Sequence, residues 1–445
     1  MFAIVFLVCA LGVILSLLVI RLLLLRHKPE LIFGKYPQKG IFYHIKYGIA
    51  LLLLKRLRHK IYTKHEQKLN AREYLAELDK PQELTDNPTS YDVVSFMAAN
   101  TEGYKLMINL ERRRRGVLKS FLYLWLPDQG LLCSPNLPDM LYFTTDGEQE
   151  NAEFKGNGCH IYPEERMRSW RIHYDGPLRI VESNQLVTVK LDLKFTSTLA
   201  HFDYNRDLSA SVIADSVARE AWNDRFFDML KNVDYILDKR THYEQNGVLE
   251  GKLSIDQQIR PIQMRGFRDH SFGTERCLST IHRYVYFSLF LNDGTSMVIG
   301  NLSQPTFFLS SLKVGYVCTS QGNYQPITKC NFELYSYGEK GKTPKHQNFI
   351  VHTTVQKYFV QIRVEEEALR YNGGDWESKI FNQFVTCTVN GIKGHGLTEY
   401  LYRNTSGRPE DVNVKDPEWY QRTREFQRSL SKRESSKDLT DSDFF

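Results

Sequence analysis

The chain has 445 residues, of which 42% are hydrophobic and 13% aromatic, so it exceeds a single small domain and can build two apolar cores. Its formal net charge of +6 is unevenly placed, because eleven Lys and Arg between Arg21 and Lys64 face one acid, Glu30. A basic segment of this kind contacts nucleic acid or an anionic membrane. Since it directly follows an apolar run, we expect a membrane partner and no nucleic acid.

Residues 2–20 form the uncharged run FAIVFLVCALGVILSLLVI, which is long enough to cross about 30 Å of hydrocarbon as a helix. A cleaved signal peptide is the alternative, but no basic residue precedes the run and no small-residue cleavage pattern follows it before Arg26. We therefore expect a transmembrane anchor over residues 1–27. Because the positive charges follow this span, we expect a single-pass membrane protein whose body faces the cytosol, at the endoplasmic reticulum or another endomembrane.

A basic interfacial and helical linker is expected over residues 28–84. Within it, Ile49–Leu54 is apolar but too short to span a membrane. The tyrosines on one side of this stretch and the basic residues 55–60 on the other suit a helix that lies at the level of the lipid headgroups. A helix packed on the soluble body explains the same pattern, and the sequence does not separate the two.

Apolar and polar residues alternate strictly in LVTVKLDLKFT, residues 186–196, which predicts a strand with one buried and one solvated face. Similar runs recur on both sides of a helical stretch near residues 205–235, separated by turn sequences such as NTEG and LNDG. We therefore predict a mainly β fold with two tandem antiparallel barrels, residues 85–240 and 241–406, and a charged, disordered tail over 407–445.

The seven cysteines are odd in number, scattered and without paired spacing, which is typical of a reducing compartment. The sequence contains no CxxC and no evident cluster of metal ligands, so we expect no metal. It also contains no GxGxxG after a strand, no Walker pattern and no HExxH, so we expect no cofactor.

The stretch GFRDHSFGTER, residues 266–276, resembles the RDHSWG signature of the AttH-like, hydroxyneurosporene-synthase-like family. ANTEG, ERMRSWRIHYDGPL, HYEQNGVLEGKL and GHGLTEYLYRN also occur in the order expected for that family. The resemblance implies two lipocalin-like barrels in tandem. Its distant members include carotenoid hydratases, fungal cyclases of the Diels-Alderase type and yeast survival-factor proteins that carry ceramide, so the implied ligand is a lipophilic small molecule.

If residues 267–272 are extended, Arg268, His270 and Phe272 face one way, whereas Asp269 and Ser271 face the other. His270 and Asp269 are the candidate catalytic residues, because the resemblance associates a His and Trp pair with catalysis in the carotenoid hydratases. Phe272 replaces that Trp here and lacks the indole donor. A buried polar network that fixes the packing, and a plain ligand contact, are the two other interpretations of the cluster.

Further candidate ligand contacts are scattered along the chain. Aromatic residues at such positions are more often part of the core, although a lipid cavity uses the same side chains. Glu399 is of interest as the one carboxylate near Gly394 and Gly396. The complete set of candidate ligand contacts is Arg268, His270, Phe272, Trp170, Tyr174, Glu399 and Tyr400.

Two classes of function follow from these observations. The first is membrane-anchored binding or transfer of a lipid, sphingolipid or isoprenoid in a lipocalin-like cavity, with no evident protein partner. The alternative is a cofactor-free hydratase, cyclase or isomerase that acts on a lipophilic polyene or isoprenoid. Acid-catalysed hydration needs a positioned proton donor, and the strand SMVIGNL, residues 296–302, contains no acid. We therefore favour binding.

Overall fold

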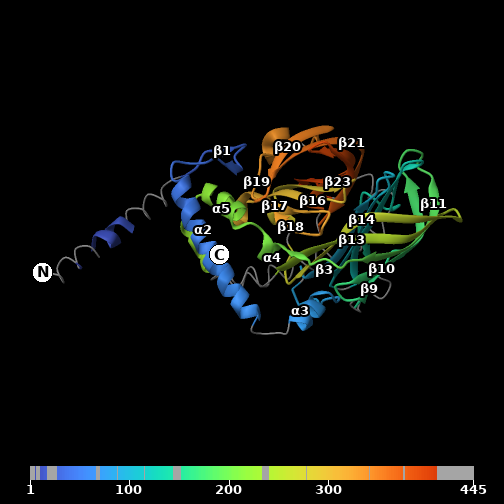
Figure 1. Ribbon diagram of the computed structural model, residues 1–445, viewed down its shortest axis with the longest axis horizontal. Helices are drawn as coiled ribbons and strands as arrows, with labels where there is room; N and C mark the ends of the chain where they lie inside the picture. Colours follow the sequence, from blue (N-terminus) through green and yellow to red (C-terminus); the bar gives the residue numbers. More distant parts are fainter. Residues whose placement is uncertain are drawn as a thin grey trace.

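The computed structural model describes residues 6, 11–17, 28–66, 71–87, 89–114, 116–143, 152–232, 240–276, 278–339, 341–373 and 376–407. Strands dominate these residues and form two large curled sheets, with a group of helices beside the second sheet (Figure 1). The expected mainly β fold is therefore confirmed, and both sheets are curled like barrels. A small separate sheet pairs β1 (Leu31–Ile32) with β2 (Tyr36–Pro37).

The first sheet closes into a ring. Within the described residues, the ring runs through β11 (Leu186–Thr196), β13 (Arg240–Ile255), β14 (Gln258–Gly273), β3 (Tyr91–Ala99), β4 (Lys105–Arg113), β5 (Val117–Leu126), β6 (Gly130–Cys133) and β10 (Ser169–Ile180). Four further strands join it, β7 (Leu141–Phe143), β8 (Phe154–Gly156), β9 (Cys159–Glu165) and β12 (Phe202–Asp203). The ring closes because β11 pairs with β13 on one edge and with β10 on the other.

Side chains fill the interior of this first barrel. The alternation predicted for residues 186–196 is confirmed, since Val187, Val189, Leu191, Leu193 and Phe195 are buried while the residues between them are more exposed. These side chains belong to one large apolar cluster that also contains aromatic rings from β3 and β10. The space inside the ring is thus used for packing, as in small barrels whose interior forms a core.

The second sheet is also curled around its own core. Phenylalanine rings from β15, β20 and the segment before η3 lie at its centre, with Phe287 4.8 Å from Phe349 and 5.2 Å from Phe332 between ring centroids. Its strands in chain order are β15 (Arg283–Leu291), β16 (Ser296–Gln304), β17 (Leu309–Cys318), β18 (Tyr324–Pro326), β19 (Lys329–Cys330), β20 (His346–His352), β21 (Lys357–Asn372), β22 (Ser378–Val389) and β23 (Ile392–Arg403). Short 3₁₀ helices are η1 (Leu278–Thr280), η2 (Pro305–Phe307) and η3 (Leu334–Tyr337).

The two sheets pack against each other through their outer faces. β3, β4 and β5 are buried along nearly their whole length, because one face contacts the first core and the other contacts the second sheet. In this contact layer the rings of Tyr123 and Phe384 lie 5.8 Å apart, and Phe267 stacks on Phe290. Polar groups on these strands are therefore removed from water and need partners within the protein.

β13 and β14 belong to the first barrel, although residues 241–406 were expected to form the second barrel. β13 pairs with β11 over residues 189–196, and β14 pairs with β3 from Arg265 to Gly273. Leu249 and Leu253 of β13 are buried in the first core. This hairpin lies between β11 and β3 in the first sheet, so the ring of the first barrel closes only with these two strands.

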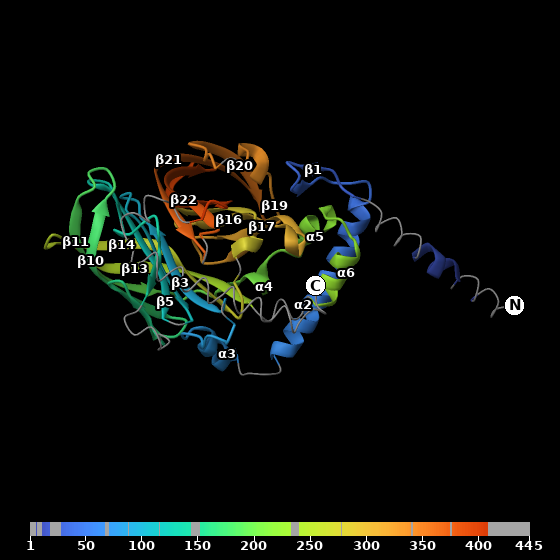
Figure 2. The ribbon, with the colours of Figure 1, turned by 180° about the vertical axis from the view of Figure 1, so that it is seen from behind.

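Helices bridge the N-terminal segment and the second sheet. α2 (Tyr43–Glu66) packs on α5 (Ala210–Arg219) and α6 (Asp224–Lys231), as seen from behind in Figure 2. Ser209 and Asn223 cap the last two helices with their side chains, as N-cap residues do. Lys46 of α2 donates to the main-chain oxygen of Glu220 at the end of α5, where the helix dipole favours a cation. α3 (Ala71–Leu78) and α4 (Tyr204–Asp207) are two shorter helices, and residues 11–17 are also helical.

The stretch around Ile49–Leu54 forms part of α2, and the structure shows this helix packed on the body of the protein. Its inner face packs on the body, with Ala50 buried against the α5 and α6 cluster. Its outer face nevertheless exposes Ile45, Leu52 and Leu53 to solvent. The expected anchor over residues 1–27 lies mostly outside the described residues, as does the expected disordered tail beyond residue 407. Among the residues that the structure describes, no helix combines the length and apolarity needed to cross a membrane.

Candidate functional site

Arg268 of the RDHS cluster points into the first barrel and is fully buried. Its guanidinium group pairs with Asp79, just after α3, at 2.6 Å and donates to the hydroxyl of Tyr243 and the amide oxygen of Gln245, both at 3.1 Å. Asp79 also accepts a hydrogen bond from the indole nitrogen of Trp170 at 3.0 Å. A fully desolvated ion pair of this kind is tolerated because both partners form further hydrogen bonds, although the Nε atom of Arg268 has none among the described residues.

His270, two residues along the same strand, is also fully buried. Its Nε2 atom lies 2.8 Å from a carboxylate oxygen of Asp92, and its Nδ1 atom lies 3.0 Å from the Tyr243 hydroxyl. Asp92 forms a second ion pair with Arg112. The edges of aromatic rings from β8 and β10 enclose the imidazole. Both ring nitrogens are thus occupied, which fits the structural interpretation of the cluster.

The predicted alternation along β14 is confirmed. Arg268 and His270 face the first barrel, whereas Asp269 and Ser271 face the second sheet. The side chain of Phe272 is half-buried, and its ring centroid lies 5.1 Å from that of His270. Of the predicted site residues, the structure brings together Arg268, His270, Phe272 and Trp170.

The three remaining candidates lie elsewhere. Tyr174 is buried in the first core, where its hydroxyl donates to the main-chain oxygen of Pro177 at 2.8 Å. Glu399 lies between the sheets and pairs with Arg370 at 2.7 Å. Tyr400 points into the second core, and its hydroxyl donates to Gln347. These residues do not converge on one cavity.

A second polar cluster lies on the outward face of β13 and β14. Glu244 of β13 is buried and accepts hydrogen bonds from the hydroxyls of Tyr204 at 2.9 Å and Tyr316 at 2.7 Å. Burial raises the pKa of Glu244, although His242 opposes this rise. The pKa of His242 is raised in turn, because Asp269 and Glu244 outweigh the effect of its own partial burial. Sequence reasoning missed this cluster, although the spacing His-x-Glu places both side chains on one face of a strand.

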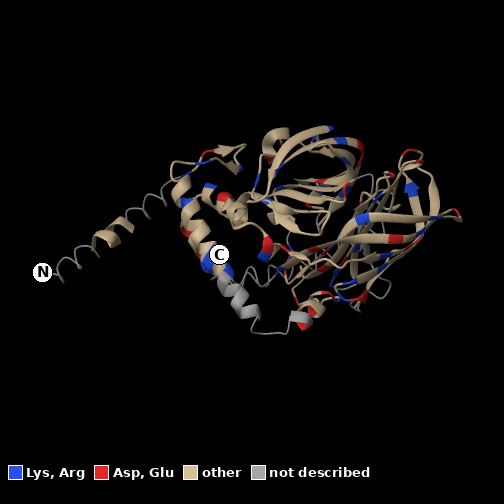
Figure 3. Ribbon diagram, viewed as in Figure 1, with Lys and Arg blue, Asp and Glu red and all other residues tan. Residues whose placement is uncertain are grey.

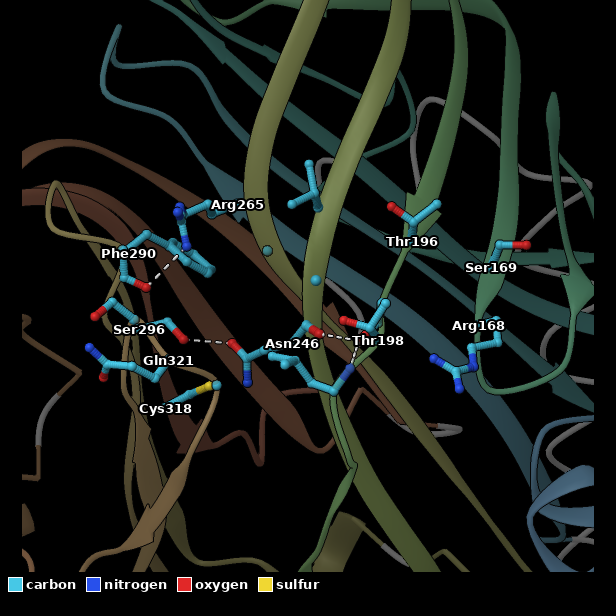
Figure 4. Close-up of a pocket in the computed structure, with 18 of the residues that line it drawn as sticks. Arg168, Ser169, Thr196, Thr198, Asn246, Arg265, Phe290, Ser296, Cys318 and Gln321 are labelled. Carbon is cyan, nitrogen blue, oxygen red and sulfur yellow. Dashed lines mark hydrogen bonds between the residues drawn. The ribbon is translucent and has the colours of Figure 1, made fainter. Parts of the chain in front are cut away.

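A pocket of about 550 Å³ opens between the two barrels beside this cluster (Figure 4). Asn246 of β13 lines the pocket and links the two sheets by hydrogen bonds. The Oδ1 atom of Asn246 accepts from Ser296 at 2.6 Å, and its amide nitrogen donates to Tyr316 at 3.1 Å. Leu199, Val248 and Phe290 contribute apolar surface. The pocket volume lies in the range that is usual for small-molecule sites.

Three cations line this pocket. The side chain of Arg168 is exposed and has no ion-pair partner among the described residues. Arg265 is held by a hydrogen bond to the main-chain oxygen of Gly294 at 3.2 Å, and Lys194 pairs with Glu164 at 2.8 Å. Glu165 is the one carboxylate of the lining. The pocket is therefore net positive. Arg168 lies inside one segment that carried the family resemblance and Arg265 directly precedes another, but no sequence pattern indicates that the two meet.

Two glycines shape the pocket wall. Gly247 and Gly266 face each other across the β13 and β14 pair. A Cβ atom on Gly247 would lie 2.3 Å from the main-chain oxygen of Thr196, and one on Gly266 would lie 2.6 Å from that of Met97. Side chains at these positions would push neighbouring strands apart, so glycine permits the close approach of backbones that forms this wall.

Comparisons with known proteins give one family and several similar structures. A model described as a family of unknown function (DUF8627) matches residues 12–402. No curated protein matches the chain. A proposed AttH protein from Nitrosomonas europaea has 12% identity and a TM-score of 0.47, with 73% of this chain and 99% of that chain covered. Kievitone hydratase from Nectria haematococca has 12% identity and a TM-score of 0.44, with 72% and 90% covered.

Replacement of His270 by Ala should strongly destabilise the protein. The substitution leaves the buried partners Asp92 and Tyr243 each short of a hydrogen bond, which costs about 1–3 kcal/mol per stranded group, so we expect a loss of about 2–5 kcal/mol. Urea unfolding followed by circular dichroism measures this loss. Ser271→Ala, on the other face of the same strand, is the matched control and should change stability little. Unaltered unfolding of His270→Ala would contradict the structural role.

Proposed function

We propose that this chain, which belongs to the family of unknown function DUF8627, binds a small amphiphile with an anionic head in the pocket between its two barrels. The observation that carries this proposal is the pocket itself, with its three cations beside apolar surface. We further propose that the chain does so at a membrane, to which its N-terminal segment attaches it.

The position of the pocket supports binding between the barrels. Side chains fill the first barrel around Trp170 and the second around Phe287, whereas the pocket of about 550 Å³ lies at the junction of the two. Walls from both sheets contribute to the pocket, with Val248 from the first and Phe290 from the second. A ligand there contacts both units at once. Sites at the interface of two units are common for small molecules.

The chemistry of the lining supports an anionic head and an apolar tail. Arg168 and Arg265 present guanidinium groups, which recognise carboxylate and phosphate through paired hydrogen bonds. Leu199, Val248 and Phe290 can cover an apolar tail. A lipophilic ligand was predicted from the sequence, and the guanidinium groups beside apolar side chains favour one class of such ligands, an amphiphile with an anionic head.

The lining favours binding over acid catalysis. Its one carboxylate, Glu165, is exposed to solvent, whereas a general acid for hydration relies on burial to keep its proton at neutral pH. His270, the candidate from the signature, lies on the opposite face of β14 with both ring nitrogens hydrogen bonded. Binding and transfer therefore remain the function that we propose.

The outer face of α2 supports contact with a membrane. Ile45, Leu52 and Leu53 are exposed on it, followed by the exposed cations Lys55 and Arg56. Figure 3 shows Lys and Arg along this helix, which follows the β1 and β2 hairpin in the chain. An apolar stripe next to basic residues is the pattern of a helix that rests on anionic lipid. We propose that α2 packs on the body with one face and on the membrane with the other.

Arg168→Gln and Arg265→Gln should each weaken binding of a fluorescent fatty acid, dansylaminoundecanoic acid, by about twofold to fivefold at low ionic strength. Each variant removes one partly exposed cation, and such charges contribute up to about 1 kcal/mol. Fluorescence titration measures the affinity. Arg363→Gln, an exposed arginine on β21 outside the pocket, is the matched control. Equal affinity in both pocket variants and the wild type, or tighter binding of the uncharged methyl ester, would refute the proposal.

A chain that lacks residues 1–27 should still bind vesicles that contain anionic lipid, in a salt-sensitive manner. Replacing Lys55 and Arg56 by Gln should weaken this binding by about 30-fold, because each basic residue near such a surface contributes about 1 kcal/mol. Vesicle co-sedimentation measures the effect. The double variant of Lys329 and Lys393, two exposed lysines on the second sheet, should bind like the parent. Binding that ignores both salt and lipid charge would exclude this role of α2.

The body is proposed to face the cytosol, because the basic residues follow the apolar N-terminal run. Protease added to intact microsomes that carry the full chain should digest the body. Addition of detergent serves as the control, since a luminal body becomes accessible only then. Protection in intact microsomes would reverse the proposed orientation.

A further inference from the structure

Three potential metal ligands converge on the outward face of the β13 and β14 hairpin. His242 and Glu244 are two positions apart on β13, so their side chains share one face. Asp269 of β14 lies directly opposite Glu244 in the strand register. One donor atom from each residue lies within 4.8 Å of the others. None of the three lines the pocket between the barrels.

Two of these donor atoms have no hydrogen-bond partner among the described residues. The Nε2 atom of His242 and the Oδ1 atom of Asp269 are both buried and face each other at 3.3 Å, yet they do not form a hydrogen bond of acceptable geometry. Buried polar atoms are rarely left in this way. A protonated His242 forms an ion pair with Asp269 at this distance, and a cation between the two atoms satisfies both when His242 is neutral.

The separations suit a small cation. Nε2 of His242 lies 3.3 Å from Asp269 and 3.7 Å from the Oε1 atom of Glu244. Ligands that bind one ion tetrahedrally at 2.0–2.2 Å are about 3.4 Å apart. Both distances are close to this value. The donor atoms of Glu244 and Asp269 lie within 4.8 Å of each other, so the two carboxylates must move together for one ion to reach all three residues.

Neighbouring side chains hold the ligands in place. The hydroxyls of Tyr204 and Tyr316 donate to the two oxygens of Glu244, each of which keeps a lone pair for an ion. The ring of Tyr204 stacks on His242 with centroids 4.2 Å apart and planes inclined by 2°. Such outer partners orient the ligands of metal sites. The nearby cation Arg276 is itself paired with Glu111 at 3.2 Å.

We propose that His242, Glu244 and Asp269 bind one divalent transition-metal ion, such as Zn²⁺ or Mn²⁺. Two carboxylates balance the charge of the ion, and an imidazole ligand favours these metals over Mg²⁺ and Ca²⁺, which prefer oxygen alone. The side chains of His242 and Asp269 are 31% and 24% exposed, so a rotation of these side chains brings their buried donor atoms within reach of an ion from solvent. The site is separate from the pocket of the proposed function and does not depend on it.

Calorimetric titration of the full chain in metal-free buffer should show saturable binding of one equivalent of Zn²⁺. His242→Ala and Asp269→Asn should each lower the affinity by at least roughly tenfold. The Tm of the wild type should rise with Zn²⁺ and that of His242→Ala should not, because a ligand of the native state stabilises it. Manganese electron paramagnetic resonance provides a second readout of the same stoichiometry.

The matched control is His173→Ala. His173 lies 3.3 Å from Asp192 on the surface of the first barrel, so it repeats the His and Asp pair outside the proposed site. This variant, and Arg168→Gln in the pocket, should bind Zn²⁺ like the wild type. If His242→Ala does not fold, Asp269→Asn gives the same comparison from a partly exposed position. Absence of one-equivalent binding to the wild type, or equal binding by wild type and Asp269→Asn, would overturn the proposal.

Discussion

The hairpin of β13 and β14 meets protein on both faces over much of its length, and this constraint organises the molecule. Its inward side chains enter the first barrel, and its outward side chains meet the second sheet. The polar groups on its buried part therefore need partners inside the protein. Arg268 and His270 find theirs inward, on Asp79 and Asp92, whereas Glu244 finds two tyrosine hydroxyls outward. One hairpin thus carries two separate polar clusters.

The alternation within RDHSFG could be predicted from the sequence, because it depends only on the pleat of one strand. The hydrogen-bond and ion-pair partners of these residues could not be predicted from the sequence. Asp92 lies 178 positions from His270, and no local pattern reveals that β3 and β14 are neighbours. The same lack of pairing information explains why residues 241–273 were expected in the second barrel. It also hid the cluster of His242, Glu244 and Asp269, whose members come from two strands.

The elements themselves were easier to predict than their surroundings. Residues 186–196 alternate because one face of β11 meets solvent, whereas the apolar runs of β3 to β5 reflect burial on both faces. The pocket, in contrast, could not be predicted from the sequence. Its lining combines turns of both sheets with the middle of β13 and β14, so Arg168 and Arg265 come together only when these distant segments have folded. A pattern in the linear sequence does not show which of these distant residues become neighbours in the fold.

The order of strands in the first ring also has a consequence for biosynthesis. Tyr91 at the start of β3 pairs with Gly273 at the end of β14, and the helices α4 to α6 are translated between them. The ribosome must therefore release nearly two thirds of the chain before this ring can close. Until then β3, β4 and β5 carry uncovered apolar surface on both faces, and pairing over such long range is slow and exposed to aggregation. A nascent chain that stops within β13 holds an open sheet with a free edge, and it is at this stage of synthesis that chaperones have most to protect.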